Sequence, residues 1–324
     1  MFFKLFKQSS SILLLTIILF FKNSWAEITP DQLPTGANIV SGDITINQEP
    51  GKLTINQTSN LGVIEWDTFN LGPEAQIYFN HLNVVDSILN KVLDSSYSSI
   101  LGKIYSNGKL FITNPNGISI GANASIDAHS FIAGAMNLAN HDFLNRNYYF
   151  TQDREASLEN LGDIKAQYVA LMAPEIKNQG SIISKNGSAQ LSAGDDMTLF
   201  INQDQSINIT VNPSKIKAKA SNDGVINSEN GVVKIRADMA QDAIAETIKA
   251  PDNQADGFVS VNGVIKLVAN SGQIRAQQVE LAAGPNGGAE VSGSINTNSD
   301  SGQGGNIQVT GKEVTIKSTA SLEA

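Results

Sequence analysis

The chain has 324 residues, of which 31 are acidic and 22 are lysine or arginine, for a formal net charge of −9 at pH 7. This acidic balance argues against nucleic acid or an anionic membrane surface as the main partner, because both carry negative charge themselves. The chain contains no cysteine, so no disulfide framework organises it.

The first residues are typical of a secretory signal peptide. Met1–Ser11 carries two lysines and no acidic side chain, and Ile12–Phe21 is an apolar run that is too short for a membrane-spanning helix. Small residues follow at Ser24 and Ala26, which predicts cleavage after Ala26. The alternative is an uncleaved membrane anchor, which the shortness of the apolar run disfavours.

The mature chain is expected to be more acidic than the precursor. Residues 1–26 hold three lysines and no acidic residue, so their removal changes the net charge from −9 to −12. No second apolar run of spanning length follows, and we expect no membrane span in the mature chain. The absence of cysteine fits two situations equally: a large fold that needs no crosslinks, or a chain that crosses a second membrane unfolded.

From Glu27 onward the pattern indicates β-structure almost throughout. Short runs rich in Ile, Val, Leu and Thr alternate with Asn, Gly, Asp and Ser, as is typical of short strands joined by turns. The clearest runs are Ile44–Ile46, Lys52–Ile55, Gln190–Ser192, Met197–Ile201 and Val314–Ile316. Helical spacing of apolar residues is confined to two short stretches, Val84–Leu93 and Met239–Lys249.

A short pattern, Asn-x-Gly-x-Ile, recurs along the chain. It begins at Asn160, Asn178 and Asn222, and the segment 261–265 resembles a fourth copy in which the asparagine has moved next to the glycine. The glycines of the first two copies are 18 positions apart, and those of the second and third are 44 apart, which we interpret as two periods. A strand–turn–strand unit that recurs at roughly 20 residues predicts a solenoid.

The predicted fold is therefore all-β, with a parallel β-helix favoured over a β-sandwich because sandwich strands recur every 8 to 12 residues or so. Inward Ile, Val and Leu would stack from coil to coil, and corner asparagines would form ladders. The segment Ile39–Ile55 is expected to cap the exposed edges and apolar floor of the first coil. No equivalent cap is visible after Val314–Ile316, which indicates either a short unseen cap or the front piece of a longer chain.

One stretch concentrates turn-forming residues between two apolar runs. Asn114, Pro115, Asn116 and Gly117 separate Leu110–Thr113 from a run that begins at Ile118. Proline presets φ near −65°, and asparagine followed by glycine tolerates left-handed values, so a hairpin or a corner turn is predicted here.

The context of this turn resembles the amino-terminal secretion domain of filamentous-haemagglutinin-like exoproteins, the passengers of two-partner secretion. The resemblance runs from about Ile39 to about Ile209 and continues more weakly to the end. Six segments carry it in order: Trp66–Gly72, Ile77–Asn80, Ser87–Val92, Ile100–Ile104, Asn107–Phe111 and Asn114–Ile118. It implies a right-handed parallel β-helix with amino-terminal capping strands and a projecting hairpin.

The resemblance also implies a function. A partner outer-membrane β-barrel transporter with POTRA domains would recognise residues 27–270 in the periplasm and export the chain to the cell surface or medium, where a haemagglutinin- or adhesin-like protein would meet a host or neighbouring cell. Residues 271–324 would continue the coils. The implied secretion determinant is Asn114, Pro115, Asn116, Gly117 and Ile118, and the implied framework is Trp66, Phe69 and Asn70. An upstream Asn-Pro-Asn-Leu sequence that many members carry is absent here.

Residues that would carry catalysis or bind a metal are sparse, so we predict no enzyme activity, cofactor or metal site. The three histidines are His81, His129 and His141, and none has metal-ligand spacing. His81 is expected at a surface turn, and the pair Asp195–Asp196 is expected to be solvated at a turn rather than to act as an acid and a base. Two alternatives remain: a polysaccharide-active enzyme built on a β-helix, and a delivery module of a larger cytolysin or toxin.

Overall fold

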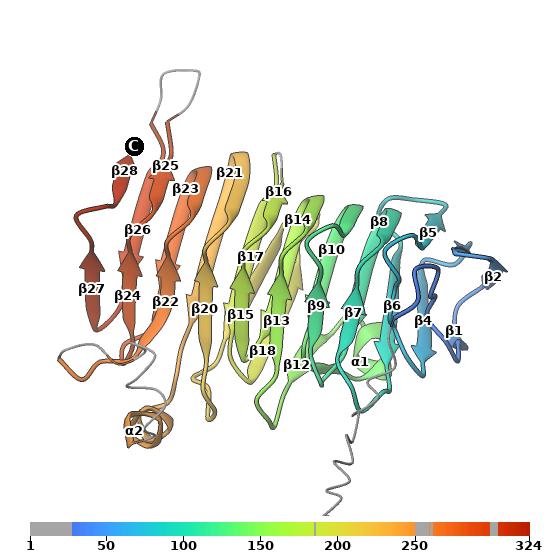
Figure 1. Cartoon of the computed structure of the whole chain (residues 1–324), viewed down its shortest axis with the longest axis horizontal. Helices are drawn as coiled ribbons and strands as arrows, with labels where there is room; N and C mark the ends of the chain where they lie inside the picture. Colours follow the sequence, from blue (N-terminus) through green and yellow to red (C-terminus); the bar gives the residue numbers. More distant parts are fainter. Residues whose placement is uncertain (1–27, 185, 250–258, 260–261, 299–303) are drawn as a thin grey trace, which may run out of the picture.

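The structure is a computed structural model that describes residues 28–184, 186–249, 259, 262–298 and 304–324. The predicted signal peptide, residues 1–26, lies outside the described residues. From residue 28 onward the chain winds into a row of stacked coils, with the amino-terminal strands at one end and the last strands at the other (Figure 1). Successive coils pair through parallel strands, which confirms the predicted parallel β-helix.

Two parallel sheets form the walls of the stack. The first has sixteen strands, with bounds β1 Asn38–Ser41, β2 Ile44–Glu49, β3 Lys52–Gln57, β4 Leu61–Trp66, β5 Gln76–His81, β6 Ser87–Val92, β8 Lys103–Thr113, β10 Ser125–Gly134, β14 Asp163–Ala173, β16 Ser181–Ile183, β17 Ser188–Ala193, β21 Val225–Ala237, β23 Gln273–Ala282, β25 Ser294–Asn296, β26 Asn306–Thr310 and β28 Ser321–Glu323. The second has eight strands, with bounds β7 Ser98–Ile100, β9 Ile118–Ile120, β13 Ser157–Asn160, β15 Glu175–Asn178, β20 Lys219–Asn222, β22 Lys266–Asn270, β24 Gly288–Val291 and β27 Glu313–Ile316.

The amino-terminal strands depart from the parallel pattern, as expected of a cap. Strands β2 and β3 form an antiparallel hairpin, and β1 runs antiparallel to β4, whereas β3 is already parallel to β5 of the next coil. The predicted capping segment Ile39–Ile55 lies within these strands. It lines the amino-terminal end of the stack (Figure 1).

An asparagine ladder holds the corners of successive coils together. Each amide Nδ2 donates to the Oδ1 of the next asparagine at 2.7 Å, from Asn160 to Asn178, then to Asn222 and then to Asn270. All four side chains are buried. A buried amide that lacked these partners would be costly, so the ladder stabilises one stacking register.

The ladder corrects two sequence-based interpretations. The fourth copy of the repeat is Asn270 to Ile274, not the segment 261–265, because Asn270 accepts the bond from Asn222. Gly180 and Gly224 are one coil apart rather than two, since β15 pairs directly with β20 and β16 with β21. The extra residues of that coil form a hairpin outside the stack, which lengthens the chain between two corners without adding a coil.

That hairpin belongs to a third, antiparallel sheet of four strands that packs on the outside of the long sheet. Its strands are β11 Asn137–Leu138, β12 Tyr148–Thr151, β18 Asp196–Ile201 and β19 Ile207–Val211, and helix α1 Asn140–Leu144 lies beside them. The sheet covers a second apolar core separate from the interior of the coils. The predicted projecting hairpin corresponds to β18 and β19. It packs against the outside of the β-helix, and this second core lies between the two.

The second core explains why one helical prediction was wrong. The segment Val84–Leu93 contains strand β6 rather than a helix. Ile88 points into the interior of the coils, whereas Leu89 packs into the outer core. A strand buried on both faces loses the alternation of apolar and polar residues by which strands are recognised.

The other helical prediction is confirmed. Helix α2 spans Gln241–Lys249 and is packed against the stack through Ala243, with its remaining side chains more open to solvent. Within the described part of the chain, no helix has the length and apolar character needed to cross a membrane.

Candidate functional site

The predicted turn at residues 114–117 is a corner between the two walls of the β-helix, not a hairpin. Strand β8 of the long sheet ends at Thr113, and β9 of the second sheet begins at Ile118. The backbone N–H of Gly117 donates to the carbonyl of Asn114 at 3.0 Å, which closes the turn. Ile118 is buried and pairs with Leu158 of the next coil, so it belongs to the interior core.

The Asn114 side chain is fully buried at this corner, and all its hydrogen-bonding groups are used. Its Nδ2 donates to the Ser96 carbonyl and to Ser98 Oγ, both at 3.0 Å. Its Oδ1 accepts from the backbone N–H of Asn116 at 2.9 Å. The Asn114 amide therefore ties the turn to the chain segment of the preceding coil.

Asn116 makes a second tie to the same segment. Its Nδ2 donates to the Asp94 carbonyl at 2.6 Å, and Arg154 Nη1 donates to its Oδ1 at 3.4 Å. On the other side, Gln152 Nε2 donates to the Pro115 carbonyl at 2.8 Å. Pro115 and Asn116 are half-buried, and they are the part of the corner that reaches solvent.

Gly117 is required by both its conformation and its surroundings. Its φ is +120°, a value that side chains rarely adopt, and a Cβ there would lie 3.1 Å from the Ser157 carbonyl and 3.3 Å from Tyr97 Cβ. The sequence pattern found this glycine, since asparagine followed by glycine favours left-handed backbone values.

The framework residues lie two coils before this corner and are structural. Trp66 and Phe69 are buried and meet edge to face, with ring centroids 5.7 Å apart. Trp66 Nε1 donates to Asn90 Oδ1 at 3.0 Å, and Asn90 Nδ2 donates to the Phe111 carbonyl at 3.2 Å. Each buried polar group of this set thus has a partner within the fold.

The motif and part of the framework converge on one segment, residues 94–99. Asn70 Oδ1 accepts from the Ser99 backbone N–H at 2.8 Å from the coil on one side, while Asn114 and Asn116 bind the same segment from the other. We call residues 94–99 the clamped segment. Sequence reasoning did not include it, because Ser96 and Ser98 lie 18 and 16 residues from Asn114 and carry no pattern of their own.

The histidines are scattered, and the expectation for His81 was wrong. His81 lies at the end of β5, is only 7% exposed and has no hydrogen-bond partner at either ring nitrogen. His129 is half-buried, and His141 is exposed next to Asp142. Among the described residues, no three His, Asp or Glu side chains are grouped so that they hold a metal ion.

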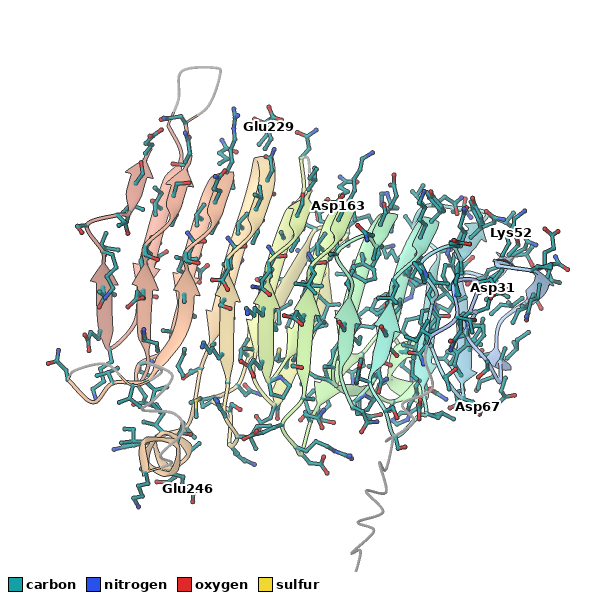
Figure 2. The ribbon with its side chains drawn as sticks, in the orientation of Figure 1. Asp31, Lys52, Asp67, Asp163, Glu229 and Glu246 are labelled. Atoms are coloured by element: carbon teal, nitrogen blue, oxygen red, sulfur yellow. The ribbon has the colours of Figure 1, made fainter. Side chains whose placement is uncertain are left out.

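The carboxylate pair also differs from expectation. Asp195 is buried rather than solvated, and its Oδ2 accepts from the Lys215 backbone N–H at 2.9 Å. Asp196 accepts from Tyr149 Oη and from Asn212 Nδ2, both at 2.8 Å. Both side chains hold the outer hairpin in place. The acidic residues labelled in Figure 2 are spread from the amino-terminal coils to α2 rather than gathered on one flank.

Burial lowers the pKa of His81 to about 4, with Asp86 opposing this shift and Lys109 adding to it. The unfolded chain therefore binds more protons than the folded chain between pH 6.5 and 4, and the free energy of unfolding falls as pH falls through that window, by roughly 3 kcal/mol at most. We expect His81→Leu to flatten this decline in urea unfolding curves at pH 7.5 and 4.5. His141→Gln, at an exposed position, serves as the control, and an equal decline in wild type and His81→Leu would contradict the assignment.

These features define a capped β-solenoid whose distinctive corner is a hydrogen-bonded clamp. Residues 26–276 match the family model of the TPS secretion domain, and the chain belongs to this family. The two-partner secretion resemblance found in the sequence is thereby confirmed. The domain is that of an exported TPS exoprotein, and it implies a cognate outer-membrane transporter.

Relatives and a solved structure agree with this assignment. The chain is 28% identical over 205 residues to a heme/hemopexin-binding protein of Haemophilus influenzae strain Rd, covering 60% of this chain and 22% of that protein. A second Haemophilus influenzae heme/hemopexin-binding protein is 32% identical over 137 residues, covering 41% of this chain and 15% of that protein. The chain thus spans about a fifth or less of these relatives. The HMW1 secretion domain from Haemophilus influenzae superposes with a TM-score of 0.73 at 25% identity, over 90% of this chain and 73% of that one.

Proposed function

We propose that residues 27–270 are the part of this chain that its transporter, an outer-membrane β-barrel with periplasmic POTRA domains, recognises, and that the corner at residues 114–118 is the determinant. The observation that supports this most is the hydrogen bonding at the corner, in which the side-chain amides of Asn114 and Asn116 donate to the clamped segment. In the folded domain these groups are unavailable to a partner. The transporter therefore reads them in the unfolded chain, where an extended segment can add to a sheet edge.

After export the same residues have a second role. Outside the cell the corner closes, Asn114 becomes buried, and the first coils provide the edge on which β10 and later strands pair. Residues 271–324 add further coils to this stack. The exported protein is then secreted or held at the cell surface, after removal of residues 1–26.

The test is transporter-dependent export. The chain is expressed in a Gram-negative host with and without its cognate transporter, as wild type and with Asn114→Ala plus Asn116→Ala, and protein is quantified in medium, on cells and in periplasm. We expect wild type outside the cell only when the transporter is present, and the double variant retained in the periplasm. Export without the transporter, or undiminished export of the double variant, would refute the proposal.

For the whole exported protein we propose a haemagglutinin- or adhesin-like role at a host or neighbouring cell. The support is the family resemblance. A second candidate is binding of heme or hemopexin, which the names of the two Haemophilus influenzae relatives favour. Binding of the purified exported protein to erythrocytes and epithelial cells, compared with binding to hemin and to hemopexin, separates the two. Of these results, only binding to erythrocytes or epithelial cells supports the adhesin role.

A further inference from the structure

A cavity of about 370 Å³ lies where the outer sheet meets the long sheet. Ser87 of β6 and Lys109 of β8 form its inner wall, and Arg146 and Tyr148 close one side. The tip of the β18–β19 hairpin closes the other side. The remaining lining residues come from the end of β18 and from the turn at this tip: Leu199, Phe200, Ile201, Asn202, Gln203 and Gln205.

The inner wall is polar although it is buried. Ser87, Lys109 and Ser130 are register partners on three neighbouring strands, so their side chains point to the same face of the sheet. All three are at most 3% exposed, and the hydroxyls of Ser87 and Ser130 have no hydrogen-bond partner. Buried hydroxyls without partners are rare in native structures, and Ser87 faces the cavity.

The charge at the cavity is positive. Lys109 Nζ donates to the Val85 carbonyl at 2.6 Å, which leaves further ammonium protons for another acceptor. Burial lowers the pKa of Lys109 to about 8, with Arg146 adding to this shift and Asp86 opposing it, so the ammonium is still largely protonated at neutral pH. The Asp86 carboxylate accepts from the Asn83 backbone N–H at 2.8 Å. Neither cation has an ion pair with a carboxylate among the described residues.

Arg146 is held at the mouth of the cavity by an unusual backbone conformation. Its φ is +58°, and its backbone N–H donates to the Phe143 carbonyl at 2.9 Å at the end of α1. A left-handed arginine costs more than asparagine or glycine would at this position. The cationic side chain is therefore not the residue that backbone geometry alone would select.

The opposite wall is apolar, with amides at its rim. Leu199 is buried in the outer core and Ile201 packs against that core, whereas the side chain of Phe200, between them, points to the opposite face of the strand. A cavity with two cations and an unpaired hydroxyl on one side and aliphatic surface on the other fits a ligand with two unlike ends. We propose that this cavity binds a small organic anion, in which a carboxylate meets Lys109, Arg146 and Ser87 and an attached ring packs against the hairpin tip.

This inference is independent of the secretion role, and it is tested on the purified, folded mature chain by isothermal titration calorimetry. The probes are sodium benzoate and sodium glucuronate, with benzamide as the neutral counterpart of benzoate and sodium sulfate as an anion without a ring. We expect at least one ring carboxylate to bind, and benzamide and sulfate to bind about tenfold or more weakly, since charge-assisted hydrogen bonds are lost with the former and apolar contacts with the latter.

Two variants locate the site. Lys109→Met and Arg146→Asn should each weaken the ring carboxylate about tenfold or more, and asparagine accepts the left-handed backbone at position 146. Lys165→Asn, which removes a solvent-exposed lysine paired with Asp127 on another strand, should leave binding unchanged. Circular dichroism checks that Lys109→Met folds. Because position 146 is exposed, Arg146→Asn tests the site even if Lys109→Met does not fold.

Several outcomes would overturn the proposal. They are benzamide or sulfate binding as tightly as the better of the two ring carboxylates, binding that neither variant weakens, and no heat of binding with either ring carboxylate.

Discussion

Gly224→Ala is expected to destabilise the central coils by about 3 kcal/mol or more, through overpacking together with lost backbone hydrogen bonds. A Cβ on Gly224 would lie 2.1 Å from the carbonyl oxygen of Gly180 in the coil before it. That oxygen cannot move freely, because it accepts from the Val225 backbone N–H at 2.9 Å. A Cβ on Gly272 would lie 2.1 Å from the carbonyl oxygen of Gly224 in the same way, so the same close approach recurs at the next coil.

The measurement is urea unfolding of the mature domain, followed by circular dichroism. Gly134→Ala is the matched control, because the nearest atoms to its Cβ would be ring carbons of Phe150 at 3.4 Å, an ordinary contact distance. We expect Gly134→Ala to change the free energy of unfolding by less than about 1 kcal/mol. Equal stability of Gly224→Ala and wild type would mean that coil stacking does not depend on this column of glycines.

The stacking of coils could be predicted from the sequence, because the corner pattern recurs even where the number of residues per coil changes. The pattern of asparagine and glycine at a fixed spacing before an isoleucine predicted the asparagine ladder, and the same pattern places Gly180, Gly224 and Gly272 one above another. Asn270 to Ile274 repeats this pattern without a change. The period was misjudged between Gly180 and Gly224 because an inserted hairpin adds length that resembles a second coil. Spacing alone does not distinguish a coil from an insertion.

The packing of the outer sheet on the long sheet could not be predicted from the sequence, for a different reason. Its core depends on residues that alternate with inward-facing ones on the same strands, such as Leu89 next to Ile88 and Phe111 next to Leu110. A strand with both faces buried has no periodicity that separates it from a buried helix. His81 was misjudged for a related reason: its neighbours in sequence suggest a turn, while its burial comes from residues around Gly108 and Asp86.

The candidate site was predictable as a turn but not as a clamp. Turn chemistry at Asn114 to Gly117 follows from local backbone preferences. The burial of Asn114 depends instead on Ser96 and Ser98, which lie in the coil before it. Side-chain partners separated by a coil leave no local pattern in a single sequence.

A matched pair of buried asparagines separates recognition from folding. Asn114→Ala and Asn222→Ala each remove a buried amide whose Nδ2 and Oδ1 are bonded within the fold, the first at the corner and the second in the middle of the ladder. Each leaves buried partners unsatisfied, so we expect both to lower the free energy of unfolding by about 1–3 kcal/mol. In stability measurements on refolded protein the two variants should look alike.

Export should distinguish them. If the transporter reads Asn114 in the unfolded chain, Asn114→Ala loses a recognition contact and its export falls about tenfold or more, whereas export of Asn222→Ala stays close to wild type. The measurement is the fraction of protein outside the cell shortly after induction, with the cognate transporter present. Equal export defects in the two variants would show that the corner acts only through the stability of the folded domain, because a buried asparagine outside the corner would then matter as much as one within it.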